Sequence, residues 1–373
     1  MSKSKLSTSM VLLFIFLAST MLPSISIVRA QEDTWTNLDP MPTARMGLGT
    51  AVVNGKIYAI GGLNSNLDTL NVNEEYDPTT KTWTTKTPMP TPRNRFGITV
   101  FENKIYVIGG NTGDYTYTRV TEVYDPTNDS WETKTSMPTP REAMDANLVD
   151  GKIYVIGGKQ RFPNVDFDIN QVYDPVNDSW SSKTSMPIGI DYYASAVINN
   201  KIYLIGGGDN NNLNQIYDPQ TDTWSNGTSL PVGVDSAAAG STIGVMASKR
   251  IYVIGGKQNL EGKNFNQIYD PETNTWIAGI SMPTPRHSHG VVVVDDVLYV
   301  LGGSIGWFGD PIVAVNEQYM PAGFEIPSPS VTPTPLPEPE SLTTLVLASV
   351  AIVVIVGFGI FAYFKKNRRK KTE

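Results

Sequence analysis

The chain has 373 residues, a formal net charge of −7, no cysteine and two histidines, His287 and His289. Without thiols it forms no disulfides, cysteine nucleophiles, iron–sulfur clusters or Cys-ligated zinc sites, and two histidines argue against multi-histidine metal centres. Basic groups gather at both ends, so the acids lie in the middle. An acidic middle repels phosphate backbones, and we expect no nucleic-acid partner.

The amino-terminal segment has the features of a secretory signal. Lys3 and Lys5 precede an apolar run over residues 10–21, and the small residue Ala30 follows a polar stretch. We therefore expect residues 1–30 to be a signal peptide cleaved after Ala30. An uncleaved anchor is the alternative, but a membrane span needs about 20 apolar residues and this run is shorter.

The middle of the chain is a repeat marked by a glycine pair. Each pair ends an alternating apolar run such as Lys56–Ile60, and a short turn such as Asn54-Gly55 separates that run from another upstream. Turn residues that tolerate positive φ between two apolar runs predict a β-hairpin. The six pairs, 47 to 49 residues apart, begin at Gly61, Gly109, Gly157, Gly206, Gly255 and Gly302.

A second hairpin follows each glycine pair. In five repeats a Tyr-Asp-Pro motif precedes a tryptophan that lies seven residues after the tyrosine: Tyr76/Trp83, Tyr124/Trp131, Tyr173/Trp180, Tyr217/Trp224 and Tyr269/Trp276. Two hairpins give four strands per repeat of about 48 residues, which is the pattern of a β-propeller blade.

These motifs resemble the Kelch-repeat family over residues 33–320. Besides the glycine pair and the spaced Tyr and Trp, a Met-Pro follows the tryptophan strand at Met41, Met89, Met137, Met186 and Met282. Leu230-Pro231 departs from this pattern. The interval from Trp224 to Gly255 is 31 residues, against 26 in the other repeats, so we expect an insertion in blade 5.

The two ends of the repeat predict how the ring closes. Trp35 has no Tyr-Asp-Pro before it, and Tyr319 has no tryptophan seven residues later. One amino-terminal strand can therefore complete the last blade and remove the exposed edges, whereas an open solenoid leaves two partial blades. We predict an all-β, six-bladed propeller over residues 31–325.

Candidate binding residues stand ten positions after each tryptophan, at what we call the approach position, where the chain approaches the first strand. Strands alternate in direction, so the strand 4–1 connections and the strand 2–3 loops share one face, here called the loop face. Four neighbouring blades carry arginine at the approach position, and the other two carry an apolar residue followed by aspartate: Arg45, Arg93, Arg141 and Arg286, against Ile190-Asp191 and Val234-Asp235.

This pattern predicts a basic arc opposite an acidic one. Arginine forks bind carboxylates bidentately, and the resemblance implies that some Kelch propellers hold acidic peptides with such arginines. The alternative is that each arginine pairs with a loop acid or caps its own blade. Asp145 replaces a small residue on the first strand, and it either faces the central channel as a ligand contact or is a hydrogen-bonded structural residue.

Other chemistry is weakly indicated. His287 and His289 lie on the same side of a strand, but two ligands do not make a metal site, and we expect no metal or cofactor. Kelch enzymes of the galactose-oxidase type need a Tyr–Cys crosslink, while sugar epimerases of this fold use polar groups in the central opening. No acid–base pair follows from spacing here. Glycosylation acceptor motifs begin at Asn128, Asn177 and Asn226, on the face opposite the arginines for the first two.

The carboxyl-terminal segment predicts a stalk and an anchor. Residues 326–341 hold six prolines, which favour a semi-rigid spacer, and residues 342–364 are 23 residues without a charge, enough to span a bilayer. The basic residues 365–373 should remain cytoplasmic. The run from Pro337 through the tail also resembles prokaryotic PEP-type sorting signals, in which a transpeptidase removes the helix.

We therefore predict a single-pass cell-membrane protein whose propeller lies outside the cell. Its expected work is to bind a protein, peptide or glycan, acidic ones included, through the loop face and without catalysis. A sugar-acting, epimerase-like propeller enzyme and a structural or adhesion component of the cell surface are the alternatives.

Overall fold

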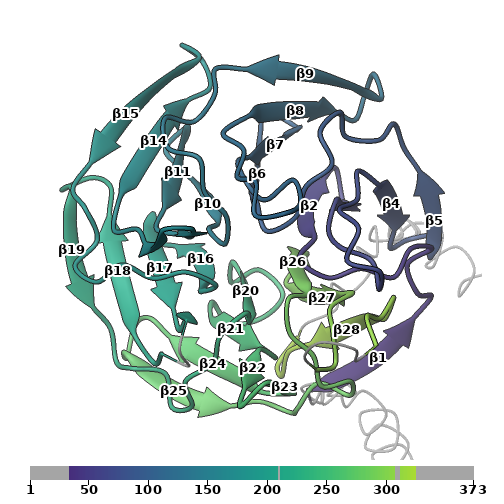
Figure 1. The fold of residues 1–373 in the computed structure, drawn as a ribbon. Helices are drawn as coiled ribbons and strands as arrows, with labels where there is room; N and C mark the ends of the chain where they lie inside the picture. Colours follow the sequence, from purple (N-terminus) through teal and green to yellow (C-terminus); the bar gives the residue numbers. More distant parts are fainter. Residues whose placement is uncertain (1–32, 209–210, 307–310, 325–373) are drawn as a thin grey trace, which may run out of the picture. The chain divides into compact units, whose positions relative to one another are not determined.

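The computed structural model describes residues 33–208, 211–306 and 311–324. Every regular element assigned in these residues is a β-strand, and the main sheets are six four-stranded antiparallel blades around a central axis (Figure 1). This confirms the predicted six-bladed propeller. The predicted signal peptide, stalk, membrane helix and basic tail lie outside the described residues, and within those residues no helix is long and apolar enough to cross a membrane.

Blades 1 to 3 follow one another along the chain, each with its first strand nearest the axis (Figure 1). Blade 1 is β2 (Gly49–Val53), β3 (Lys56–Ile60), β4 (Asn73–Asp77) and β5 (Thr82–Thr85). Blade 2 is β6 (Gly97–Phe101), β7 (Lys104–Ile108), β8 (Thr121–Asp125) and β9 (Ser130–Lys134). Blade 3 is β10 (Ala146–Val149), β11 (Lys152–Ile156), β14 (Asn170–Asp174) and β15 (Ser179–Lys183).

Blades 4 to 6 repeat the pattern. Blade 4 is β16 (Ala194–Ile198), β17 (Lys201–Ile205), β18 (Asn214–Asp218) and β19 (Thr223–Asn226). Blade 5 is β20 (Ala238–Ser241), β21 (Ile251–Ile254), β24 (Asn266–Asp270) and β25 (Thr275–Ala278). Blade 6 is β26 (Gly290–Val294), β27 (Val297–Leu301), β28 (Asn316–Met320) and, from the start of the chain, β1 (Thr34–Leu38).

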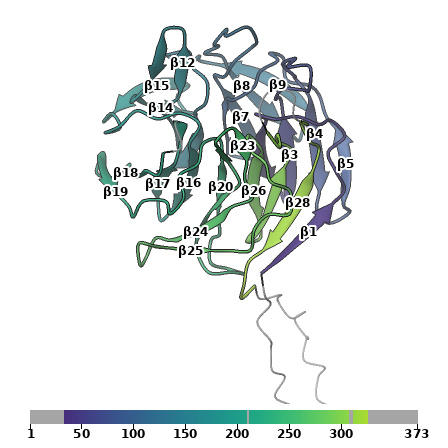
Figure 2. The same cartoon turned by 60° about the horizontal axis from the view of Figure 1, so that its bottom comes forward.

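Two small hairpins rise from the strand 2–3 loops of blades 3 and 5. The first joins β12 (Lys159–Arg161) to β13 (Asn164–Asp166), and the second joins β22 (Lys257–Gln258) to β23 (Glu261–Gly262). Figure 2 shows β12 standing at the edge of the loop face. The loop face is therefore built up by extra strands, whereas the opposite face, here called the turn face, carries the short hairpin turns.

The ring closes as the sequence predicts. β1 pairs antiparallel with β28 from Thr34↔Met320 to Leu38↔Asn316, which places Trp35 opposite Tyr319. The Trp35 indole also donates a hydrogen bond to the carbonyl of Ile280 in blade 5, at 2.9 Å. Each of the other five outer-strand tryptophans donates to the preceding blade at 2.9 to 3.0 Å, so six indoles form a belt around the rim.

The hydrophobic core lies between neighbouring blades rather than within one. Met89, for example, is fully buried among residues of blades 1 and 2. Leu230, the one departure from the Met-Pro pattern, is 1% exposed in the equivalent position and fills the same kind of space. The glycine pairs bring the chain close to the next blade: a Cβ on Gly61, whose φ is +60°, would lie 2.5 Å from the carbonyl oxygen of Arg93.

A second belt, of backbone hydrogen bonds, surrounds the axis on the loop face. One residue per blade, two positions after the approach position, donates its N–H to the carbonyl of its counterpart in the preceding blade, at 2.7 to 3.1 Å. All six have φ between +48° and +61°. This axial ring is Gly47, Arg95, Ala143, Tyr192, Ser236 and Ser288.

The predicted insertion in blade 5 extends the hairpin turn between β20 and β21 on the turn face. The carboxylate of Asp296 in blade 6 accepts four backbone hydrogen bonds from this turn, at 2.6 to 3.1 Å. At its tip Ile243 and Val245 remain 66% and 70% exposed. The insertion thus leaves the loop face unchanged.

Candidate functional site

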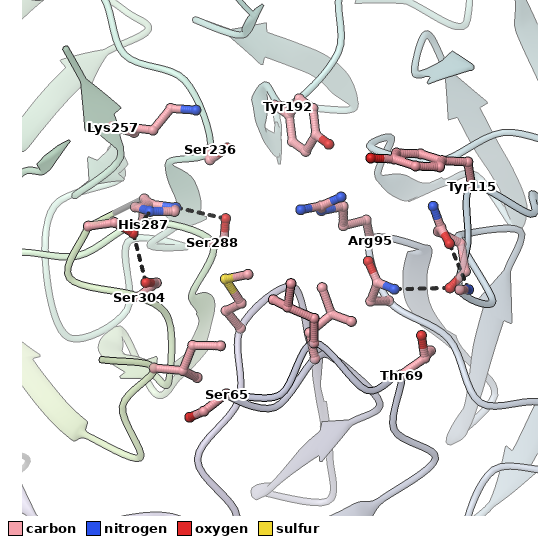
Figure 3. Close-up of a pocket in the computed structure, with 18 of the residues that line it drawn as sticks. Ser65, Thr69, Arg95, Tyr115, Tyr192, Ser236, Lys257, His287, Ser288 and Ser304 are labelled. Carbon is pink, nitrogen blue, oxygen red and sulfur yellow. Dashed lines mark hydrogen bonds between the residues drawn. The ribbon is translucent and has the colours of Figure 1, made fainter. Parts of the chain in front are cut away.

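A pocket of about 480 Å³ opens at the centre of the loop face. Strand 2–3 loops and strand 4–1 connections from all six blades contribute to this region, which is the face that the strand directions predict. Figure 3 shows polar side chains pointing into the pocket from opposite sides. Its lining includes an apolar side formed by Met46, Leu63, Leu67, Pro311 and Ile312.

The axial ring supplies the pocket floor. Four of its six members, Arg95, Tyr192, Ser236 and Ser288, line the pocket. Their backbone groups are fixed by the ring of hydrogen bonds, so their side chains start from rigid positions. Side chains placed on a rigid scaffold hold a ligand with less loss of conformational entropy than side chains on free loops.

One side of the pocket is a basic–aromatic wall formed by Arg95, Tyr115, Arg161 and Tyr192. The Arg95 guanidinium lies 5.3 Å from the centre of the Tyr192 ring, and the Arg161 guanidinium lies 5.6 Å from that of Tyr115. Arg161 also donates to the Tyr192 hydroxyl at 3.1 Å. Cation–π contacts of this kind orient the planar guanidinium groups.

A buried acid stands behind this wall. Glu142 is fully buried and pairs with Arg95 at 3.3 Å and with Arg161 at 3.5 Å. Burial works to lower the pKa of Arg161, but Tyr192 and Glu142 outweigh it, and the pKa of Arg161 rises above its ordinary value. Both arginines therefore keep their charge while 21% and 30% of their side chains stay exposed.

Apolar side chains project from the loops around the pocket. They are between 37% and 72% exposed. We call them the apolar collar: Leu67, Tyr115, Phe162, Val165, Leu260 and Ile305. Tyr115 and Phe162, from the loops of blades 2 and 3, meet edge to face with ring centres 5.2 Å apart.

The side of the pocket near blades 5 and 6 is hydroxyl-rich. The His287 ring contacts the Ser288 hydroxyl at 3.0 Å through Nδ1 and the Gly306 carbonyl at 3.1 Å through Nε2. Lys257 lies beside them and pairs with Asp235 at 3.0 Å (Figure 3). His289 lines the central channel instead, so the two histidines serve different cavities. Among residues 33–208, 211–306 and 311–324 no group of three His, Asp or Glu side chains is arranged to hold a metal ion.

The predicted basic arc is not a surface, which corrects the sequence interpretation of the approach position. The side chains of Arg45, Arg93, Arg141 and Arg286 are 0% exposed and lie inside their own blades. Arg45 pairs with Glu74 at 2.6 Å and donates to the Ala59 carbonyl at 2.8 Å. A ligand on the loop face does not reach these guanidinium groups, because none of their surface is exposed.

The other arginines have equivalent partners on the third strand of their blades. Arg93 pairs with Glu122 and Arg286 pairs with Glu317. Arg141 instead donates to the amide oxygen of Gln171, at 2.6 Å. The alternative interpretation is that each arginine pairs with a loop acid or caps its own blade. Three of the four arginines do pair with an acid of their own blade, but that acid lies on the third strand and not in a loop.

The predicted acidic arc is also internal. Asp191 is 1% exposed and pairs with Lys159, and Asp235 is 9% exposed and pairs with Lys257. Burial raises the pKa of Asp191 above its ordinary value, although Lys159 opposes this shift. Asp235 thus neutralises a lysine from the strand 2–3 loop of its own blade 5, and Asp191 of blade 4 neutralises one from the strand 2–3 loop of blade 3.

Asp145 lines a second, polar cavity of about 330 Å³ between the first strands, the central channel. The Ser195 hydroxyl lies 3.0 Å from an Asp145 carboxylate oxygen and 3.0 Å from the Asn147 amide oxygen. Burial raises the pKa of Asp145 to about 6, with Ser195 opposing the shift. The sequence-predicted residue therefore faces the channel and not the pocket.

The three glycosylation acceptors, Asn128, Asn177 and Asn226, are exposed. Asn128 donates to Asp125 at 2.9 Å and Asn177 to Asp174 at 2.7 Å, within the strand 3–4 turns of the turn face. The middle residue of each of these two motifs has a structural task, because Asp129 and Asp178 accept a backbone hydrogen bond from the preceding blade at 2.9 and 2.8 Å.

Sequence reasoning missed the basic–aromatic wall. Arg95 and Tyr192 stand two residues after the approach position, so they follow the same repeat spacing as the predicted binding residues. Tyr115 and Arg161 lie in strand 2–3 loops, whose lengths vary and whose residues follow no repeat. The spacing could have revealed the first two, but not the last two.

Comparison with known proteins agrees with this fold. The model described as the KLHDC2/KLHL20/DRC7 Kelch-repeats domain matches residues 19–207, and the Kelch motif matches residues 191–231 and 285–319. Kelch-like protein 15 of Danio rerio is 35% identical over 78 residues, which are 18% of this chain and 13% of that protein. Kelch-like protein 7 of Rattus norvegicus is 44% identical over 43 residues, 12% of this chain and 7% of that protein.

The chain thus matches only a small part of the length of these curated relatives. Among solved structures, one described as "Structure of YjhT" has a TM-score of 0.63 at 17% sequence identity, covering 75% of this chain and 96% of that chain. At this identity the likeness is one of fold.

Proposed function

Because the chain belongs to the Kelch-repeat family, we propose that it is a binding protein whose pocket on the loop face takes a carboxylate-bearing segment of a partner protein. The observation that carries this proposal is the basic–aromatic wall. Two oriented, partly exposed guanidinium groups, Arg95 and Arg161, share one buried carboxylate, Glu142, at the edge of a pocket of about 480 Å³.

The charge in the pocket favours an anion. The charged residues in its lining are three bases, Arg95, Arg161 and Lys257, and one acid, Asp114. Glu142 offers one negative charge to two guanidinium groups, so the wall keeps an excess of positive charge. A guanidinium fork binds a carboxylate through two parallel hydrogen bonds, which adds geometric selectivity to the attraction.

The apolar collar favours a protein segment over a small anion. A free carboxylate would leave the collar in water, whereas a peptide with apolar side chains beside its acid would cover it. Tyr115 is both part of the wall and part of the collar, at 51% exposed, so the two surfaces are continuous. Exposed apolar groups that gather on one face mark a protein-binding surface, and here they border the charged wall.

Peptide binding to the full chain tests the proposal. A library of peptides that carry one acid between apolar residues is screened by fluorescence polarisation, and the best binder is measured against variants. We expect Arg161→Ala to weaken binding about tenfold or more, Arg161→Lys to have an intermediate effect, and added salt to lower the affinity. Lys104→Ala on the turn face, a 41% exposed base paired with Asp125, is the matched control.

Equal affinities for Arg161→Ala and Lys104→Ala, with both proteins folded, would contradict the proposal. A failure of all acidic peptides while neutral ones bind would do the same.

A sugar-acting enzyme is the second candidate, and Asp145 is the observation that favours it. A carboxyl group with a pKa of about 6 in a polar channel can exchange a proton near neutral pH. Turnover in a screen of free sugars, abolished by Asp145→Asn, would support this activity. A structural or adhesion role at the cell surface is the outcome if neither ligand nor substrate is found.

The location outside the cell also remains part of the proposal, and its support comes from the sequence. The signal-like residues 1–30 and the uncharged residues 342–364 predict that the propeller is exported and anchored. Protease added to intact cells should then degrade the propeller and spare the basic tail. A propeller protected until the cells are lysed would contradict this placement.

A further inference from the structure

We propose that Ser288 and His287 form a nucleophile–base pair on the floor of the pocket, able to accept an acyl group from a carboxylic ester. The His287 ring lies 3.0 Å from the Ser288 hydroxyl, and the serine opens into the pocket (Figure 3). A serine activated by an adjacent base, with the base oriented by a third group, is the arrangement that nucleophilic catalysis requires.

The third group is the Gly306 carbonyl, and it fixes the tautomer of His287. A carbonyl oxygen only accepts, so the Nε2 atom, 3.1 Å away, carries the proton. The lone pair of Nδ1 then faces Ser288 and can accept its hydroxyl proton. The Ser304 hydroxyl donates to the same Gly306 carbonyl at 2.9 Å, which holds this oxygen in place.

The nucleophile is held rigidly while the base is shielded. Ser288 belongs to the axial ring: its N–H donates to Ser236 at 2.8 Å and its carbonyl accepts from Gly47 at 2.7 Å. The serine side chain is partly exposed to the pocket, whereas His287 is only 4% exposed. A ligand in the pocket can therefore reach the hydroxyl without displacing the imidazole.

The reaction balances with water as the only co-reactant. The Ser288 oxygen attacks the ester carbonyl carbon and passes its proton to Nδ1 of His287. The bond to the leaving alkoxide breaks, the alkoxide takes that proton, and an acyl group stays on Ser288. Water then attacks the acyl carbon in the same way and returns the serine. Negative charge on the carbonyl oxygen meets Arg95, whose guanidinium points toward Ser288 across the floor (Figure 3).

The protonation state of His287 agrees with a base. Burial lowers the pKa of His287 below 6.5, the Gly306 carbonyl opposes this shift, and among the neighbouring charges Lys257 and Arg95 lower it while Asp235 raises it. The neutral imidazole, which is the form that acts as a base, is therefore favoured more than in an ordinary histidine. Acylation should accordingly persist below the pH at which an ordinary histidine loses its activity as a base.

Covalent labelling of the full chain tests the pair. A fluorophosphonate probe should label Ser288, located by mass spectrometry of peptides, and the chain should hydrolyse p-nitrophenyl acetate. We expect Ser288→Ala to abolish both signals and His287→Asn to reduce both at least tenfold. Ser181→Ala, at an exposed position of β15, is the control and should match the natural chain.

Both variants have precedents in other blades, so they should fold. Ala143 occupies the position of Ser288 in blade 3 with a φ of 60°, and Asn94 occupies that of His287 in blade 2. No labelling of the natural chain, or equal labelling of Ser288→Ala, would overturn the proposal. The test is independent of the proposed peptide binding, because neither probe contains a carboxylate or a peptide segment and both signals are measured without peptide.

Discussion

Two groups of blades fill the same interior position with different side chains. The first group is blades 1, 2 and 6, and the second is blades 4 and 5. In the first group a buried arginine at the approach position pairs with a glutamate on the third strand, as in Arg93–Glu122. In the second group the arginine is replaced by an apolar residue and the glutamate by glutamine. The side-chain amide of Gln215 in blade 4 donates to the Ile188 carbonyl at 2.9 Å and accepts from the Ile188 N–H at 3.1 Å.

The comparison teaches that the approach residue and the third-strand residue are one unit. Where the arginine is absent, the carboxylate is absent too, because a buried carboxylate without a cation is costly. In both groups the unit anchors the strand 4–1 connection to its own blade. The pocket on the loop face is then lined by the residue two positions later, as at Arg95, so the binding chemistry lies beyond the position that carries the charge.

Removing one partner of the ion pair should have the largest effect. Glu122→Ala leaves the charge of Arg93 buried without its acid, and we expect the free energy of unfolding to fall by about 3–5 kcal/mol. Gln215→Ala in blade 4 removes neutral hydrogen bonds only and should cost about 1–2 kcal/mol. Denaturant unfolding followed by tryptophan fluorescence measures both.

Equal losses for these two variants would remove the distinction between the two groups of blades. A loss confined to Gln215→Ala would reverse it.

Exchanging the whole unit should cost much less than breaking it. Arg93→Ile combined with Glu122→Gln gives blade 2 the pattern of blade 4. We expect this double variant to lie within about 2 kcal/mol of the natural chain, because a buried ion pair and a well-packed neutral pair differ little in net stability. Thermal and denaturant unfolding of the single and double variants yields the coupling energy. A double variant as unstable as Glu122→Ala alone would show that blade 2 needs the charges themselves.

The fold was predictable from the sequence because its signals recur. Trp35 and Tyr319 predicted the closing strand, since each lacked the partner that every complete repeat supplies. The blade number, the insertion in blade 5 and the loop face follow from spacing in the same way. Residues that recur at the same spacing occupy the same place in each blade. The propeller consists of such repeated blades, so the spacing predicts its fold.

The site was harder to predict because spacing does not report burial. Arg93 and Arg95 are two residues apart in one connection, yet the first is fully buried and the second points into the pocket. The positive φ of the axial ring, 53° at Arg95, turns the chain between them. Arg161 comes from a loop outside the repeat, so only the folded chain brings it to Glu142.

Asp145 extends the comparison to a buried carboxylate without an arginine. Its contribution to the free energy of unfolding should depend on pH. Burial raises the pKa of Asp145 from 3.8 to about 6, so the folded state binds a proton that the unfolded state has lost between these values. Stability due to this group is therefore lost as the pH rises through 6. Asp145→Asn should raise the free energy of unfolding by about 1–2 kcal/mol at pH 7 and leave it unchanged near pH 4. The same gain at both pH values would refute this explanation.

Arg141 stands between the two groups of blades, because its partner on the third strand is the neutral Gln171. Burial lowers the pKa of Arg141 to about 10, the shift expected for a buried cation without an acid. Gln171→Glu would give blade 3 the pattern of blades 1, 2 and 6. The Thr139 hydroxyl, now 3.0 Å from the Gln171 amide nitrogen, could donate to the new carboxylate as Thr43 donates to Glu74 at 2.7 Å.

This single substitution should therefore stabilise the propeller, by about 1 kcal/mol, because the new carboxylate gives a buried guanidinium the acid that it lacks. For a domain of this size the gain corresponds to a rise of about 2 °C in Tm, measured by calorimetry. The matched control is Gln215→Glu in blade 4, where the approach residue is the apolar Ile190 and the new carboxylate finds no arginine, so Tm should fall. If both substitutions lower Tm alike, the glutamate does not act through the arginine, and the two groups of blades differ only in packing.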